Sequence, residues 1–459
     1  MKKLKAWAIL LFLPLGLLSQ SDLMLYDFQS LGQSLKLNPA TEQKSKLWIG
    51  LPVLSNFSFH YHNSAFAMVD VLRKGTDPNE NLALVAASLN DRSQLTINTN
   101  TDLLAIGFST KKGYFTFGAN QHIDYRMDMP NDLFLLLFGE VVTSEGANFS
   151  LSTFDLENII RTNFYVGYQH KLMNDKLTLG GRFKYIIGQA HAYIERSNIS
   201  LQGDDPFSVT ASSDVLVRTS GAANALDGPD PDYLSLSFSN NRGYGLDLGF
   251  NYDINDKWSV SGSVLDLGFI RWSENNKEYY SKGEYEYEGM EVDFSDPDGV
   301  GNSYENTVDT LEKVFNFQER EGVAYTRKLM NRVFFNTTYN VSERHSFAGT
   351  YHARIWNGEM FHDVGVKYIG RWGRGFEFHT GYSIINGTYT NIGAGFAAKM
   401  GPIQLFLMSE NIYGATYFDN LRTTNLRAGL NITIYGSDKK EKQEQELREK
   451  LDEEEQALK

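Results

Sequence analysis

The sequence predicts an all-β fold: a transmembrane antiparallel β-barrel of about 14 strands, with about 12 to 16 allowed. Three observations support this class: two-faced strands recur along most of the chain, tight turns alternate with long connections, and an export signal precedes them. Residues 244–253 show the two faces best, with Tyr244, Leu246 and Leu248 on one side and Asp247 on the other. Successive side chains of a strand point to opposite sides. In a membrane barrel the apolar side meets lipid and the polar side meets a hydrated interior.

Residues 1–20 have the composition of a cleavable signal peptide. Three lysines stand among the first five residues, and an apolar run follows over residues 6–18. This run is short for a membrane-spanning helix, which needs about 20 apolar residues, so a signal is favoured over an anchor. The chain has no Cys, which excludes a lipid-modified N-terminal cysteine, disulfides and thiolate metal sites. The expected location is the outer membrane.

Composition narrows the function classes. A formal net charge of -13 argues against nucleic-acid binding, which requires a basic face. The mean hydropathy of -0.35 is low for a membrane protein, but a barrel strand exposes only one of its faces to lipid. The strand pattern continues through residues 47–435 without a Pro- or Ser-rich linker, which favours one barrel over several domains. An antiparallel soluble sandwich is the alternative that the pattern leaves open.

Fourteen segments have the length and alternation of spanning strands, which need about 10 residues when tilted. They are residues 48–59, 94–110, 113–121, 161–170, 177–194, 244–253, 257–270, 332–340, 346–355, 361–371, 375–384, 388–399, 402–410 and 423–435.

Charged residues in these strands fall on the face opposite the apolar residues. In residues 177–189, Arg182 and Lys184 lie opposite Leu179 and Phe183. A charge in mid-membrane on the lipid side would cost about 2–4 kcal/mol, so such charges are expected in the interior. They either pair across the interior and fill it, or line a pathway and tune its selectivity. The residues predicted to line the lumen are Arg182, Lys184, Asp247, Lys367, Glu377, His379 and Arg427.

The connections differ strongly in length. Turn-forming residues join several strand pairs, whereas two long polar loops are expected near residues 202–232 and 273–321. A helical periodicity occurs in residues 303–319. Residues 436–459 are dense in Glu, Lys and Gln, and are expected to form a charged periplasmic helical tail. This tail is either solvated or in contact with a periplasmic protein partner.

Residues 21–46 precede the first strand and contain Asn38, Pro39 and Ala40. This tripeptide resembles the N-terminal hatch of FadL-type long-chain fatty-acid transporters, but the resemblance extends no further and carries no ligand with it. Residues 35–40, 49–55, 255–268 and 409–414 together resemble an uncharacterised outer-membrane barrel family of Bacteroidota-type bacteria, domain-of-unknown-function family 5723. The resemblance implies a barrel with a segment before its first strand. We expect this segment to form a plug in or under the lumen.

No motif in the sequence predicts catalysis or a bound metal. The acidic stretch 293–299 approaches an EF-hand loop, but Phe294 stands where the first ligand is required, so an acidic turn is favoured. Residues 227–232 form a similar turn. His60 and His62 share a strand face without a third ligand nearby, which favours packing. We therefore predict no enzyme activity, no catalytic residue, no cofactor and no metal site.

These features favour a plugged channel or transporter for a small solute, with hydrophobic compounds among the candidate ligands. Outer-membrane lipid would surround it, and nucleic acid is not an expected partner. The alternative function is a structural or scaffolding barrel that docks partner proteins through its loops and its tail.

Overall fold

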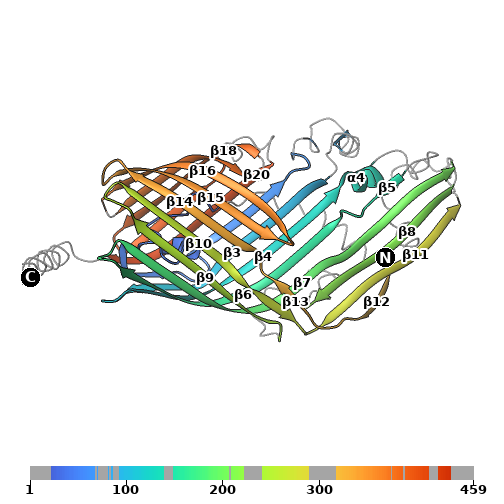
Figure 1. Cartoon of the computed structure of the whole chain (residues 1–459), viewed down its shortest axis with the longest axis horizontal. Coiled ribbons are helices and arrows are strands. Elements are labelled where there is room, and N and C mark those ends of the chain that lie inside the picture. The colour runs from blue at the N-terminus through green and yellow to red at the C-terminus, as the bar shows by residue number, and fades with distance from the viewer. Residues whose placement is uncertain are drawn as a thin grey trace, which may run out of the picture.

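The computed structural model describes residues 22–67, 70, 81, 84–85, 92–138, 148–205, 208–221, 240–288, 317–373, 375–385, 388–412 and 422–435. Within these residues, fourteen strands form a closed antiparallel barrel (Figure 1). Its wall consists in chain order of β1 (Ser45–Gly50) with β2 (Phe57–Asn63) as one interrupted strand, β3 (Arg92–Ser109), β4 (Tyr114–Pro130), β6 (Asp155–Leu172), β7 (Leu177–Asp205), β9 (Arg242–Asp253), β10 (Trp258–Trp272), β14 (Asn331–Asn340), β15 (His345–Trp356), β16 (Glu359–Trp372), β17 (Phe376–Ile385), β18 (Thr388–Met400), β19 (Ile403–Ser409) and β20 (Thr423–Tyr435).

The barrel closes where its last strand meets its first. β20 pairs with β1, placing Ser45 opposite Tyr435, and with β2, placing Phe57 opposite Ala428. On their other side, β1 and β2 both pair with β3. Every strand of the wall therefore has two neighbours, and the predicted all-β barrel of about 14 strands is confirmed.

The wall separates an apolar outside from a polar inside. In β9, Tyr244, Leu246 and Leu248 are between 39% and 48% exposed, whereas Asp247 between them is fully buried. Phe115, Phe117, Phe164, Val166 and Phe183 are exposed in the same way on the neighbouring strands β4, β6 and β7. The apolar side of each strand is thus on the outside of the barrel and the polar side faces the filled interior, the arrangement expected of a barrel in a membrane.

The first strand is interrupted, whereas the sequence pattern predicted a continuous strand over residues 48–59. Between β1 and β2, Pro52 cannot donate a backbone hydrogen bond. Val53 adopts a positive φ of 64°, and the Ser55 amide donates back to the Leu51 carbonyl at 2.7 Å. The chain makes a turn here, and its two halves resume pairing with the same neighbours.

One wall strand continues far beyond the barrel. β7 has 29 residues, of which Leu177–Ile187 pair with β9 and residues between His191 and Asp205 pair with β8 (Ser208–Ser220). β8 pairs with β11 (Asn276–Glu288), β11 with β12 (Gln318–Glu321), and β5 (Asn148–Ser150) with the other edge of β7. Figure 1 shows β8, β11 and β12 projecting past one end of the barrel. Strands thus occupy much of the two segments expected to be polar loops.

The remaining described elements are short. The helix α4 (Asn131–Phe138) contains the longest apolar run of the chain after the leader, and β13 (Tyr325–Lys328) pairs with β10. Across the described ranges, no helix combines the length and the apolar character needed to cross a membrane. The predicted signal peptide, the acidic turns 227–232 and 293–299, most of the predicted helix 303–319 and the tail 436–459 lie outside the described residues.

Candidate functional site

The N-terminal segment, residues 22–44, lies inside the barrel. It contains one 3-10 helix, η1 (Gly32–Lys36), whose residues are all buried. Within the described residues, hydrogen bonds connect the segment to ten strands of the wall: β3, β6, β7, β9, β10, β14, β16, β17, β19 and β20. Because these strands are distributed around the ring, the segment occupies the lumen rather than one side of it.

Apolar side chains hold this segment in place. Tyr26 stacks on Phe334 with ring centroids 5.0 Å apart, and Phe28 stacks on His379 at 3.9 Å. Burial of one such side chain contributes about 1.5–3 kcal/mol. The cluster combines residues of the segment with residues of β10, β14, β18 and β19: Leu25, Tyr26, Phe28, Leu31, Leu37, Leu265, Phe334, Ala397, Phe406 and Met408.

The tripeptide Asn38, Pro39 and Ala40 is fixed against two wall glycines. Asn38 Nδ2 donates to Tyr26 Oη and to the Phe250 carbonyl, both at 3.1 Å, while Asn38 Oδ1 accepts from the Ala40 amide at 2.9 Å. A Cβ at Gly249 would lie 2.1 Å from Asn38 Oδ1, and one at Gly180 would lie 2.3 Å from the Pro39 carbonyl oxygen. Only glycine permits this approach, so the wall and the tripeptide are shaped to each other.

The predicted lumen residues fall into two charge networks. The first network surrounds Asp247, which lies 2.5 Å from Arg182 Nη2 and 2.7 Å from Lys184 Nζ. Lys184 also reaches Asp266 at 2.6 Å. Arg182 donates to the Lys36 carbonyl at 2.8 Å, so the network also anchors the N-terminal segment.

The second network surrounds Glu377. Its carboxylate accepts from the Ser30 amide at 2.9 Å and lies 3.1 Å from His379 Nε2. His379 Nδ1 lies 3.1 Å from the Met24 carbonyl, and Lys367 Nζ donates to the Leu23 carbonyl at 2.9 Å. These wall charges therefore bind backbone groups of the segment, which would otherwise be buried without partners.

The seventh predicted residue, Arg427, joins the first network through Asp22. It forms an ion pair with Asp22, whose other carboxylate oxygen lies 3.2 Å from Arg332 Nη1. Arg332 in turn reaches Asp266 at 3.1 Å. A carboxylate of the N-terminal segment is thus held between guanidinium groups from β14 and β20.

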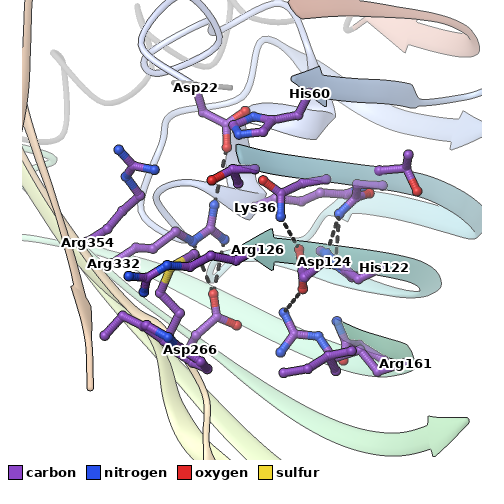
Figure 2. Close-up of a pocket in the computed structure, with 18 of the residues that line it drawn as sticks. Asp22, Lys36, His60, His122, Asp124, Arg126, Arg161, Asp266, Arg332 and Arg354 are labelled. Carbon is purple, nitrogen blue, oxygen red and sulfur yellow. Dashed lines mark hydrogen bonds and ion pairs between the residues drawn. The ribbon is translucent and has the colours of Figure 1, made fainter. Parts of the chain in front are cut away.

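A cavity of about 120 Å³ lies beside this part of the segment (Figure 2). Its walls come from β2, β3, β4, β6, β7, β10, β14, β15, β16 and β20, together with the segment itself. The described residues that carry charge in the lining are Arg126, Arg161, Arg182, Arg332, Arg354, Arg427, Lys36 and Lys184, against Asp22, Asp124, Glu157 and Asp266.

Several of these charges are paired within the lining. Arg161 lies 3.4 Å from Asp124, which also accepts from Asn98 at 2.9 Å. Figure 2 shows Arg126, Arg332 and Arg354 on one side of the cavity and His122, Asp124 and Arg161 on the other. The cavity is therefore a polar chamber with cations on opposite walls.

The two histidines of the first strand have different surroundings. His62 Nδ1 lies 2.8 Å from Thr423 Oγ1 on β20. His60 lines the cavity and is 3% exposed, yet neither of its ring nitrogens has a hydrogen-bond partner among the described residues. In that part of the chain, no three His, Cys, Asp or Glu side chains are placed to hold a metal ion together.

Burial shifts the ionisation of groups on the N-terminal segment. It lowers the pKa of Lys36 to about 8, against the opposing effect of Asp102, with which Lys36 forms an ion pair. Burial also raises the pKa of Asp27 above its ordinary value and the pKa of Tyr26 to about 12. All three shifts favour the neutral form, as expected for groups removed from water.

A second, wider cavity of about 620 Å³ opens where the projecting sheet leaves the barrel. Arg327 lines it, with its guanidinium 4.3 Å from the centroid of the Tyr193 ring. Arg327 also lies 2.9 Å from Glu157, which lines the inner cavity and contacts His191 at 3.0 Å. One ion pair therefore stands between the outer and the inner cavity.

Sequence reasoning did not select most of the charged cavity residues. Arg126, Arg161, Arg332 and Arg354 lie on wall strands, and Asp22 lies on the segment. The signal that could have found the arginines is their place on the polar face of an alternating strand. Which polar-face charges meet at one level of the barrel depends on strand register.

The solved structures to which this chain is similar include three proteins. The first is the Pseudomonas putida toluene transporter TodX, with a TM-score of 0.42 and 10% identity, covering 88% of this chain and 94% of that chain. The second is a Pseudomonas aeruginosa FadL homologue, with a TM-score of 0.40 and 10% identity, covering 91% of this chain and 96% of that chain. The third is the translocator domain of the autotransporter NalP from Neisseria meningitidis, with a TM-score of 0.33 and 8% identity, covering 86% of this chain and 91% of that chain.

The curated proteins gave no match to the sequence. The model of one protein family, described as "Family of unknown function (DUF5723)", matches residues 39–410. This range covers most of the barrel wall and begins at Pro39, within the tripeptide that contacts Gly180 and Gly249. The chain therefore belongs to the family of unknown function DUF5723.

Proposed function

We propose that this protein is an outer-membrane channel or transporter for a small solute, with residues 22–44 as its plug. The observation that carries the proposal is the set of hydrogen bonds from this segment to ten described strands around the lumen. A segment held in this way obstructs the interior, and the inner cavity lies beside it.

The outer surface supports placement in a membrane. Large apolar side chains are exposed on strand after strand of the wall, including Phe117, Val166, Phe183, Leu248 and Val366. Contiguous exposed apolar surface of this extent marks a contact with lipid or protein. A closed barrel has no free strand edge within its wall, which is the condition for a sheet to cross a bilayer. Lipid is therefore the partner proposed for this surface.

Deletion of residues 23–43 tests the plug. It removes the segment up to the residue before Lys44 and leaves β1 intact. The folded full-length protein in a planar lipid bilayer should pass little current, whereas the deletion variant should pass a steady ion current. Heat-modifiable migration on a gel would establish that both barrels are folded. A folded deletion variant that stays silent contradicts the role of residues 22–44 as the plug.

A further inference from the structure

Cations outnumber carboxylates in the lining of the inner cavity. Eight Lys and Arg side chains and four carboxylates are found among its described residues. The balancing carboxylates Asp102, Asp128, Asp247 and Asp363 pair with these cations but lie outside the described lining, and each is fully buried. The surface presented to a solute is therefore more positive than the barrel interior as a whole.

Asp22 shows that this wall accommodates an oxyanion. Its carboxylate contacts Arg332 on β14 and Arg427 on β20, two guanidinium groups from different strands. Arginine presents its donors in a planar fork that suits carboxylate and phosphate oxygens. Within the structure, a carboxylate already occupies one such position beside the open part of the cavity.

A second pair of arginines lies around Phe361. The guanidinium carbons of Arg126 and Arg354 are 5.1 Å and 5.8 Å from the centre of that ring. Arg126 lies 2.7 Å from Asp128, while the Arg354–Asp363 pair is longer at 3.4 Å. The two guanidinium groups lie together in the lining, each with a carboxylate partner, and an anion in the adjoining space would be attracted to both.

His60 supplies an independent indication of a ligand. It lines the same cavity, and Figure 2 shows it next to Asp22. No hydrogen-bond partner is present for either ring nitrogen within the described part of the chain, although the side chain is almost completely buried. His352 has one ring nitrogen on Asp363 at 2.9 Å and the other, Nε2, without a partner there. Buried polar atoms are normally hydrogen-bonded, and a ligand oxygen would complete these sites.

We infer that the inner cavity binds a small polar oxyanion, a free phosphate, sulfate or carboxylate, between Arg126, Arg354 and His60. The inference rests on the proposed channel function, because it names the class of solute for that channel. An uncharged hydrocarbon in the same space would leave both ring nitrogens of His60 without a partner among the described residues, which is unfavourable. The lining therefore selects for charge more than for apolar surface.

Isothermal titration of the folded full-length barrel in detergent tests this inference, with inorganic phosphate and succinate as probes and glycerol as the neutral comparison. We expect both anions to bind, glycerol not to bind, and the affinity for anions to fall as salt is raised. The double variant R126Q/R354Q should bind phosphate at least tenfold more weakly. R344Q is the matched control, since Arg344 lies in an exposed turn between β14 and β15, and it should bind as the wild type does.

A second variant keeps the inference testable if R126Q/R354Q does not fold. Asp22→Asn removes the internal carboxylate from Arg332 and Arg427 without altering the wall, so phosphate should bind several-fold more tightly. Absence of phosphate and succinate binding to both folded wild type and D22N would overturn the inference, as would unchanged affinity in folded R126Q/R354Q. The tests of the two proposals have separate outcomes. A folded deletion variant that passes no current contradicts the plug but does not affect the proposal of anion binding. A deletion variant that conducts, together with a wild type that binds no anion, contradicts only the oxyanion site.

Discussion

The two halves of the lumen differ in what fills them. In the half that holds the N-terminal segment, Tyr26 and Phe28 pack against Phe334 and His379 in an apolar cluster. In the other half, the same wall presents arginines to a cavity. β14 contributes to both, since Phe334 packs on the segment and Arg332, two residues earlier on the same face, lines the cavity.

The comparison shows how one strand serves two purposes along its length. Side chains on the inner face need a partner, and the N-terminal segment supplies apolar groups and backbone carbonyls to some of them. Beside the cavity, charged side chains of the wall are paired with other strands and with Asp22 of the segment. One strand, β14, therefore contacts the segment through Phe334 and lines the cavity through Arg332.

The largest expected effect comes from breaking the packed half without removing the segment. In G180A the new Cβ would lie 2.3 Å from the Pro39 carbonyl oxygen, so the tripeptide can no longer sit against the wall. We expect the closed channel to open in bilayer recordings. G181A is the control, because its Cβ would meet Leu248 Cδ2 at 3.7 Å, an ordinary contact. Equal currents from the two variants would show that the Gly180 contact does not hold the segment.

The next effect concerns the charge network at the boundary of the two halves. Asp247→Asn leaves Arg182 and Lys184 without their shared buried carboxylate, and breaking a buried ion pair costs about 3–5 kcal/mol. Urea titration of the folded barrel should show this loss in the free energy of unfolding. Asp256→Asn, in the exposed turn between β9 and β10, should change that free energy by no more than about 0.5 kcal/mol. A similar small change in D247N would mean that Asp266 compensates for the lost charge.

The smallest effect is a pH dependence that comes from the segment itself. Burial lowers the pKa of Lys36 to about 8, so the unfolded chain holds this proton over a pH range in which the folded chain has lost it. Stability from this group is therefore fully present above the ordinary lysine pKa and is lost as pH falls through 8. Between pH 8 and pH 10, the urea midpoint of the wild type should rise relative to that of K36Q. Parallel midpoints across that range would exclude Lys36 as the titrating group.

The sequence was sufficient to predict the wall. Each of the fourteen strands has an apolar face on the outside and a polar face toward the lumen, so apolar and polar residues alternate along the sequence. The interruption at Pro52 was not predicted, because apolar residues continue on both sides of the turn. The strands β8 and β11 were not predicted either. The sheet that they form projects beyond the barrel, so neither strand needs a continuous row of apolar residues on one face.

The cavity was less predictable than the wall. Alternation assigns Arg332 and Arg354 to the polar face, but it does not say that they reach the same level of the barrel as Arg126. That convergence depends on the stagger between strands, to which the bulges at Asp102 and at Val264–Leu267 contribute. The position of Asp22 depends on the path of a segment with no regular alternation. Which charged side chains meet in the cavity depends on the register of the strands. That register is set by pairing between strands that are far apart in the sequence.

The pairing of the last strand with the first limits the order in which the barrel can fold. Ser45 pairs with Tyr435, and Phe57 pairs with Ala428, so the ring lacks its final contacts until almost the whole chain has been delivered. Until then, β1 and β2 have an unpaired edge and an apolar face, which are prone to aggregation in water. An N-terminal segment whose hydrogen bonds reach ten described strands of the wall can settle only afterwards. Closure of the lumen is therefore expected as the last step of assembly.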